Sequence, residues 1–228
     1  MKKNRITVVF SSHLGKEINN TFRQHIDNTI GVEHFIICYE NPNEFSLSEL
    51  YNEAIEHHSS DDNILAFCHP DIIFKTNNWG KLLLNQFHNH DYGILGVAGT
   101  THLTETGRWW DKNECMIGIV EHTNGINTWE NRYSESFYGV RPTVLVDGVF
   151  IAIDPEKIIH GFDTNYGKFH FYDLGFCIPN YLDGVNIGVI TNIRILHKSI
   201  GITNEDWETN RIKFAENYKD ELPIIYQE

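Results

Sequence analysis

Two residues that can bind metal, His69 and Asp71, interrupt the apolar run ILAFCHPDIIF at positions 64–74. Continuous hydrophobicity predicts a buried strand, and Pro70 cannot donate a sheet hydrogen bond, so the strand should end there. If the backbone stays extended, residues two apart point the same way, which would bring the imidazole and the carboxylate together. A carboxylate suits Mg²⁺ or Mn²⁺, and Mn²⁺ also accepts an imidazole. The alternative is a Pro-Asp turn with a structural, hydrogen-bonded histidine.

A second group of chemically competent side chains lies in GFDTNYGKFHFYDLGFC, residues 161–177. His170 and Asp173 are surrounded there by aromatic residues, and such an environment can raise a carboxylate pKa toward a value useful for a general base. Alternatively, Asp173 only caps a helix. His197 ends a third segment, NIRILH, as His69 ends its own apolar run. A lone histidine after a strand is more often structural than a ligand.

The elements that must position these residues alternate between strand and helix in the first hundred residues. ITVVF, HFIICY, ILAFC and YGILGVAG read as strands, and Ile18, Phe22 and Ile26 recur at helical spacing between the first two. Ser46 and Glu49 match a capping box that opens a further helix. This alternation predicts an α/β fold with a mostly parallel sheet covered on both faces, as in a Rossmann-like α/β/α sandwich.

The second half of the chain is less regular. Residues 100–142 show no clear period and predict a long irregular segment, of the kind that is often functional. TVLVDGVFIAI predicts a strand pair or a strand bent at Gly148, and DPEKII predicts a short helix opened by Asp154 and Pro155. NIGVITNIRILH predicts a strand, and residues 203–221 predict a final amphipathic helix.

Composition limits the possible partners. The 228 residues are 41% hydrophobic and carry a formal net charge of −13, which argues against nonspecific nucleic-acid binding and against docking on anionic lipid. No stretch approaches a membrane span, although peripheral association stays open. The four cysteines form no C-x-x-C pair, which favours reduced thiols and a cytoplasmic protein. We expect one domain over residues 1–228.

Taken in order, these motifs resemble the glycosyltransferases of the GT-A fold, and more narrowly the bacterial family-2-like branch. A strand ending in x-x-D precedes V-D-G-x-F, then G-F-D…F-Y-D, and finally a histidine that closes a strand. The resemblance runs from Ile6 to about Phe214 and is most specific in residues 161–177. It implies a nucleotide-binding half over about residues 1–100 and an acceptor and catalytic half over about residues 101–228.

The resemblance also implies roles for individual positions. Asp71 matches the metal-binding Asp of the D-x-D motif, with His69 in place of its first Asp, and His197 matches a histidine that completes metal coordination. Asp173 falls on the catalytic base of inverting members, with Tyr172 where Glu is more usual and Gly175 where many relatives carry Asp. The implied donor-binding set is Ser11, Ser12, His13, Tyr39, Glu40, Asn41, Asn52, His69 and Asp71. The predicted substrate-binding residues are Trp109, Trp110, Asp147, Gly148, His170 and Tyr172. The adjacent indoles of Trp109 and Trp110 could stack on the apolar faces of sugars on the acceptor side, or they could instead close the core under the long irregular segment.

The sequence therefore predicts a glycosyltransferase dependent on Mn²⁺ or Mg²⁺. It would move a hexose from a nucleotide-sugar donor, with UDP the expected nucleotide, to a glycan or glycoconjugate acceptor in polysaccharide assembly. A sugar nucleotidyltransferase fits poorly because SSHLGKE is a weak match to a triphosphate-binding loop. The second interpretation is a catalytically inactive GT-A-like protein that binds a nucleotide sugar or glycan; the departures at His69, Tyr172 and Gly175 keep it open.

Overall fold

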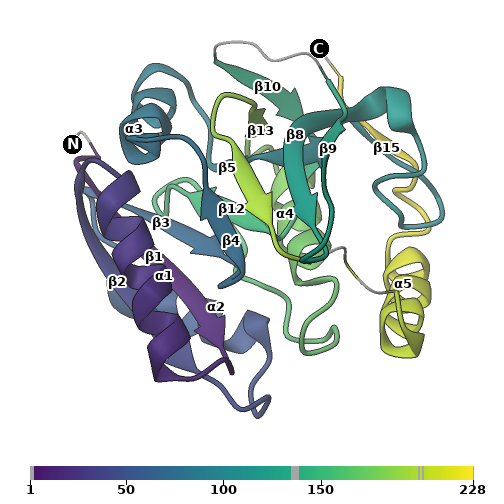
Figure 1. Cartoon of the computed structure of the whole chain (residues 1–228). Helices are drawn as coiled ribbons and strands as arrows, with labels where there is room; N and C mark the ends of the chain where they lie inside the picture. The colour runs from purple at the N-terminus through teal and green to yellow at the C-terminus, as the bar shows by residue number, and fades with distance from the viewer. Residues whose placement is uncertain (1–2, 135–138, 200, 202, 228) are drawn as a thin grey trace.

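The first third of the chain builds a parallel sheet with helical connections. The computed structural model describes residues 3–134, 139–199, 201 and 203–227. In order, the first elements are β1 (Arg5–Ser12), α1 (Lys16–Thr29), β2 (Glu33–Glu40), α2 (Leu47–His58) and β3 (Asn63–Cys68). Strand β1 pairs in parallel with both β2 and β3, so the carboxyl ends of all three strands meet at one edge (Figure 1).

The remaining chain extends this sheet and adds a second one. The elements are β4 (Ile72–Phe74), α3 (Trp79–Asn89), β5 (Ile94–Gly96), β6 (Ala98–Thr100), β7 (His102–Leu103), the 3₁₀ helix Asn113–Cys115, β8 (Met116–Thr123), β9 (Thr128–Arg132), β10 (Val140–Thr143), β11 (Leu145–Val146), β12 (Phe150–Ile153), α4 (Tyr172–Leu182), β13 (Ile187–Ile190), β14 (Ile195–His197), α5 (Glu205–Asn217) and β15 (Ile224–Ile225). The large sheet has the order β10-β13-β5-β12-β3-β1-β2, and the second has the order β11-β6-β8-β14-β4 with β9 beside β8.

The large sheet is mixed, with three parallel and three antiparallel strand pairings. Strand β12 runs antiparallel to both of its neighbours, β3 and β5, while β13 is parallel to β5 and β10 antiparallel to β13. Strands β2, β1, β3, β5 and β13 therefore point the same way, and only β12 and β10 oppose them. The predicted α/β class is confirmed.

Helix α2 forms as its sequence predicts. The Ser46 hydroxyl accepts a hydrogen bond from the Glu49 backbone N–H, and the Glu49 carboxylate accepts one from the Ser46 N–H, which completes the capping box. Behind this cap, Leu50, Tyr51 and Ala54 are buried in the core. None of the described helices is both long enough and apolar enough to cross a membrane.

Helix α1 corrects one prediction. Ile18 is 50% exposed, whereas Asn19 is buried together with Phe22 and Ile26. The buried stripe of this helix follows positions 19, 22, 26 and 29, and Ile18 lies one position off that stripe. Local hydrophobicity placed Ile18 on the wrong side because the orientation of a helix is set by the whole stripe.

The second half of the chain departs further from the sequence predictions. Residues 155–157 form only a turn, in which Asp154 accepts a hydrogen bond from the Glu156 N–H, and residues 158–171 contain no helix. Within the segment predicted to be irregular, β8 and β9 form an antiparallel hairpin. Strand β9 has the mostly polar sequence TWENR, so a search for hydrophobic periodicity could not detect it. YGILGVAG divides between two sheets, since β5 belongs to the large sheet and β6 to the second.

Candidate functional site

The strand pair β4–β14 brings Asp71 and His197 together. In the antiparallel register Ile72 lies opposite His197, and the Lys198 N–H donates to the Asp71 carbonyl at 3.0 Å. Nε2 of His197 consequently lies 3.4 Å from Oδ1 of Asp71. Two residues that are far apart in the sequence thus share one end of a strand pair.

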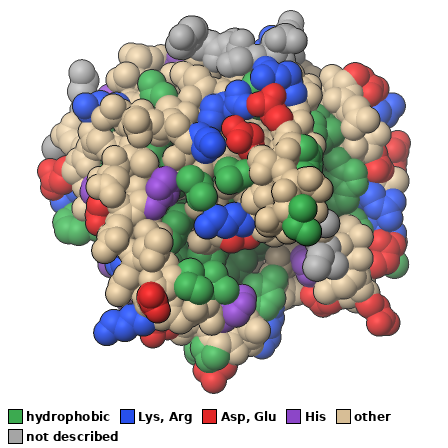
Figure 2. Space-filling view, viewed as in Figure 1, with side chains coloured by type: hydrophobic (Ala, Val, Ile, Leu, Met, Phe, Trp, Pro, Cys, Tyr) green, Lys and Arg blue, Asp and Glu red, His purple; other side chains and the backbone are tan. Residues whose placement is uncertain are grey.

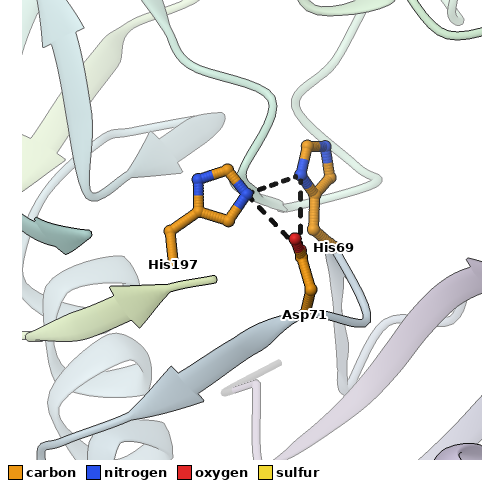
Figure 3. Close-up of side chains that lie close together, drawn as sticks. All are labelled: His69, Asp71 and His197. Atoms are coloured by element: carbon orange, nitrogen blue, oxygen red, sulfur yellow. Dashed lines mark hydrogen bonds and ion pairs between the residues drawn. The ribbon is translucent and has the colours of Figure 1, made fainter. Parts of the chain in front are cut away.

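His69 reaches the same point from the large sheet. Strand β3 ends at Cys68, which lies opposite Phe150 of β12, and the His69 N–H donates to the Val149 carbonyl at 3.2 Å. Nδ1 of His69 lies 3.3 Å from Nε2 of His197 and 3.9 Å from Oδ1 of Asp71. Figure 3 shows the three side chains converging.

The three donor atoms fit a divalent cation. All lie within 4.8 Å of one another, and this is the one such group found among the described residues. Ligands about 2.0–2.2 Å from an ion and about 90–110° apart are separated by about 2.8–3.6 Å. The 3.3 and 3.4 Å separations fall within this range, and the 3.9 Å separation between His69 and Asp71 lies slightly above it. Two imidazoles and one carboxylate suit a first-row transition metal better than Mg²⁺, which prefers oxygen ligands.

Electrostatics also favours a cation at this group. Burial lowers the pKa of His69, and the neighbouring His197 lowers it further, so the ring is held neutral and able to bind metal. Burial alone would raise the pKa of Asp71, but the hydrogen bond to His197, the neighbouring imidazoles of His197 and His69 and a backbone hydrogen bond together outweigh it, and the net shift is downward. Asp71 is therefore an anion at neutral pH.

The start of α4 packs against the turn between β11 and β12. The hydroxyl of Tyr172 donates to the Gly148 carbonyl at 2.9 Å, and Oδ2 of Asp173 accepts from the Gly148 N–H at 3.0 Å. Oδ1 of Asp173 accepts from the Leu174 N–H at 3.0 Å, while Asp147 accepts from the Val149 N–H. One peptide turn thus positions two carboxylates and a phenol.

Asp173 has the electrostatics of a general base. Burial raises its pKa, the neighbouring Asp147 raises it further, and hydrogen bonds from the Leu174 and Gly148 N–H groups offset part of the rise. The resulting pKa is about 7. A carboxyl group with this pKa can take and return a proton near neutral pH.

All of these side chains except Asp71 line one cavity of about 410 Å³. Hydrophobic and histidine side chains gather around a hollow on the face shown in Figure 2. The predicted residues that line this cavity are His69, Trp109, Trp110, Asp147, Gly148, His170, Tyr172, Asp173 and His197. Trp109 is only 7% exposed, whereas Trp110 is 37% exposed and tilts against Trp207 with ring centroids 5.4 Å apart. Trp109 thus also closes the core, while Trp110 is open to a ligand.

The remaining predicted donor-binding residues lie outside this cavity lining. Ser11 and Ser12 pair in register with Tyr39 and Glu40, which places the ends of β1 and β2, and His13 after them, side by side. The amide of Asn41 bonds to the backbone of residues 44 and 45.

Asn52 of α2 makes a structural contact with the loop that precedes α4. Its amide bonds twice to the backbone of Phe162, at 2.7 and 2.8 Å. Asn41 and Asn52 therefore hold loops in place, and their amides are occupied within the chain itself.

Several cavity residues escaped the sequence analysis. His122 lies opposite His197 in the parallel register of β8 and β14, and its Nδ1 lies 3.0 Å from the Ser199 carbonyl. Tyr133 and Trp207 complete the aromatic wall. The run MIGIV before His122 was the available signal, since it has the hydrophobicity of a strand that ends near a histidine.

Comparison with known proteins gives a consistent assignment. The model of a glycosyltransferase-like family matches residues 10–218. The sequence matches none of the curated proteins.

Two solved structures share the fold. A mannosyltransferase from Pyrobaculum calidifontis, PcManGT, in complex with GDP-Man and Mn²⁺, aligns with a TM-score of 0.56 and 10% identity over 97% of this chain and 66% of that one. GalNAc-T7 with UDP, GalNAc and Mn²⁺ aligns with a TM-score of 0.56 and 10% identity over 96% of this chain and 48% of that one. The chain thus spans just under two thirds of the first protein and about half of the second.

Proposed function

The chain belongs to the glycosyltransferase-like family and has the GT-A fold, and from this we propose that it transfers a hexose from a nucleoside-diphosphate donor to a hydroxyl of a glycan or glycoconjugate. One observation carries the proposal. A carboxyl group with a pKa of about 7, Asp173, lines the same cavity as two members of a group that could hold a metal ion, His69 and His197.

In this proposal Asp173 acts as the base. It takes the proton of the acceptor hydroxyl while that oxygen attacks the anomeric carbon from the face opposite the diphosphate. The bond between the anomeric carbon and the diphosphate oxygen breaks, and its electron pair leaves with the diphosphate. Because the attack comes from the opposite face, the sugar is transferred with inversion. The chemistry that a divalent ion supplies when bound is electrostatic stabilisation of the negative charge on the departing diphosphate. His69, Asp71 and His197 would hold that ion.

The two halves of the domain would bind different substrates. We assign the donor nucleotide to residues 1–100, where the ends of β1 and β2 offer Ser11 and Tyr39, and the acceptor to residues 101–228. UDP is the expected nucleotide, and the complexes of PcManGT and GalNAc-T7 with Mn²⁺ support Mn²⁺ as the ion. We place the reaction in the cytoplasm because all four cysteines are free. The proposed glycan or glycoconjugate acceptor places it in polysaccharide or glycoconjugate assembly.

Two measurements test the proposal. A thermal-shift screen of UDP, GDP, dTDP and CDP with and without Mn²⁺ selects the nucleotide, since a ligand at about 100 times its dissociation constant adds about 2.7 kcal/mol of stability. The corresponding nucleotide sugar is then incubated with candidate acceptors, and the anomeric configuration of the product is read by NMR. A retained configuration would exclude Asp173 as the base of a single displacement. Nucleotide-sugar binding without turnover would favour the inactive binding protein.

A further inference from the structure

A chain of hydrogen bonds joins the start of α4 to the metal-binding group. Nε2 of His69 lies 2.9 Å from the hydroxyl of Tyr172, and that hydroxyl donates to the Gly148 carbonyl at 2.9 Å. On the other side of the ring, Nδ1 of His69 faces His197 and Asp71. The imidazole thus bridges the phenol and the metal-binding group.

These hydrogen bonds determine where the protons of the Tyr172 hydroxyl and the His69 ring lie. A carbonyl oxygen can only accept, so the single proton of the Tyr172 hydroxyl is used on Gly148. The phenol oxygen must then accept from His69, which requires the proton of the neutral imidazole to be on Nε2. Nδ1 therefore carries a lone pair, and it is the atom that lies 3.3 Å from Nε2 of His197 and 3.9 Å from Oδ1 of Asp71.

We propose that Tyr172 is a positioning residue for the metal site, which fixes His69 in the tautomer and ring orientation that make Nδ1 a ligand. Groups that bond to the outer nitrogen of a ligating histidine commonly change metal affinity about 10- to 100-fold. The Glu that the resemblance places at this position would be an anion, whereas Tyr172 is neutral and is itself anchored by Gly148. The inference rests on the proposed function only for the role of the metal.

The absence of a side chain at Gly148 is required for the same hydrogen-bond arrangement. A Cβ at this position would lie 2.2 Å from the Tyr172 hydroxyl oxygen, so only glycine allows the phenol to reach the carbonyl. The ring of Tyr172 is buried against Tyr51 and Phe162 at centroid distances of 5.9 and 6.4 Å. These contacts fix the ring by packing, and Tyr172→Phe retains them while it removes only the hydroxyl.

The test is a double-mutant cycle read by Mn²⁺ binding to the full chain without any nucleotide, with free Mn²⁺ measured by EPR. The four proteins are the native chain, Tyr172→Phe, His69→Asp and the double variant. Tyr172→Phe should weaken Mn²⁺ binding about 10- to 100-fold when His69 is present. In the His69→Asp background, which has no imidazole to orient, the same change should alter Mn²⁺ binding by less than about twofold.

The nitrogen chemical shifts of His69 give a second readout, which does not depend on metal binding. In the metal-free chain the proton should reside on Nε2, and Tyr172→Phe should mix the two tautomers. A proton found on Nδ1, an equal loss of affinity in both backgrounds, no loss in either, or no saturable Mn²⁺ binding to the native chain would each overturn the inference. Tyrosine-dependent Mn²⁺ binding in a chain that transfers no sugar would instead sustain it and refute the proposed function.

Discussion

Oδ2 of Asp173 accepts a 3.0 Å hydrogen bond from the backbone N–H of Gly148, a residue 25 positions earlier in the chain. This contact fixes the carboxylate beside Asp147, the residue whose charge helps to raise its pKa. The hydrogen bond partly stabilises the anion, while burial and the second carboxylate oppose it. The balance leaves a group that is half protonated near neutral pH.

Replacing this carboxylate should separate catalysis from binding. Asp173→Asn keeps the size of the side chain but removes the base, so kcat should fall about 10²- to 10⁴-fold. The dissociation constant of the donor nucleotide should be nearly unchanged. Asp183→Asn is the matched control, because Asp183 is exposed at the far end of α4 and pairs only with His160 among the contacts described. Retained turnover in Asp173→Asn would refute the assignment of the base.

The pH dependence of transfer should follow Asp173. Because the base must be deprotonated, kcat/KM should rise with pH, with unit slope below about pH 7 and a plateau above it. Asp147→Asn removes a negative neighbour, so the pKa of Asp173 should fall and the rising limb should move to lower pH. A profile that does not move in this variant would show that Asp147 does not influence the titrating group.

The same pKa predicts a stability effect. A carboxyl group whose pKa is raised on folding stabilises the protein fully only below its unfolded pKa of about 3.9, and this contribution is lost as pH rises through the folded pKa of about 7. Asp173→Asn cannot ionise, so its melting temperature relative to the native chain should be higher at pH 8 than at pH 5. Calorimetry at the two pH values measures the difference, and a constant difference would contradict a raised pKa.

Metal preference should depend on His69. His69→Asp replaces one nitrogen donor by oxygen, which should raise the affinity for Mg²⁺ relative to Mn²⁺ and Co²⁺. Competition between Mg²⁺ and Mn²⁺, followed by EPR of free Mn²⁺, measures the ratio. His34→Asp serves as the control, since His34 lies on β2 and is hydrogen-bonded to Asp27 and to the Val32 carbonyl. An unchanged ratio in His69→Asp would mean that His69 does not ligate the ion.

The adjacent tryptophans should behave differently. Trp109 is buried, so Trp109→Ala should cost about 3–5 kcal/mol of unfolding free energy. Trp110 is open to the cavity, so Trp110→Ala should leave stability nearly intact and raise the KM for the acceptor about tenfold. Denaturant unfolding and acceptor titration measure the two effects. Equal effects of both variants on KM would assign both indoles to the acceptor.

Local sequence determined much of the scaffold. The capping box of Ser46 and Glu49, the apolar stripe behind it, the β-branched run of β1 and the apolar run of β3 each depend on neighbours within a few positions. Pro70 marked the end of a strand for the same reason, because it cannot donate to a sheet wherever it lies. The end of a strand and the identity of its flanking residues are therefore readable from the sequence.

The tertiary structure decided which residues lie next to those strand ends. The register of β4 on β14 brings Asp71 to His197, and the packing of α4 on the β11–β12 turn brings Tyr172 to His69, 103 positions away. No local pattern encodes such distances, because they follow from how whole elements pack. The polar strand β9 and the exposed Ile18 were mispredicted for the same reason: pairing and orientation are settled by partners that are remote in the sequence. The sequence alone supplied the side chains of His69, Asp71 and His197, and the fold brought them together.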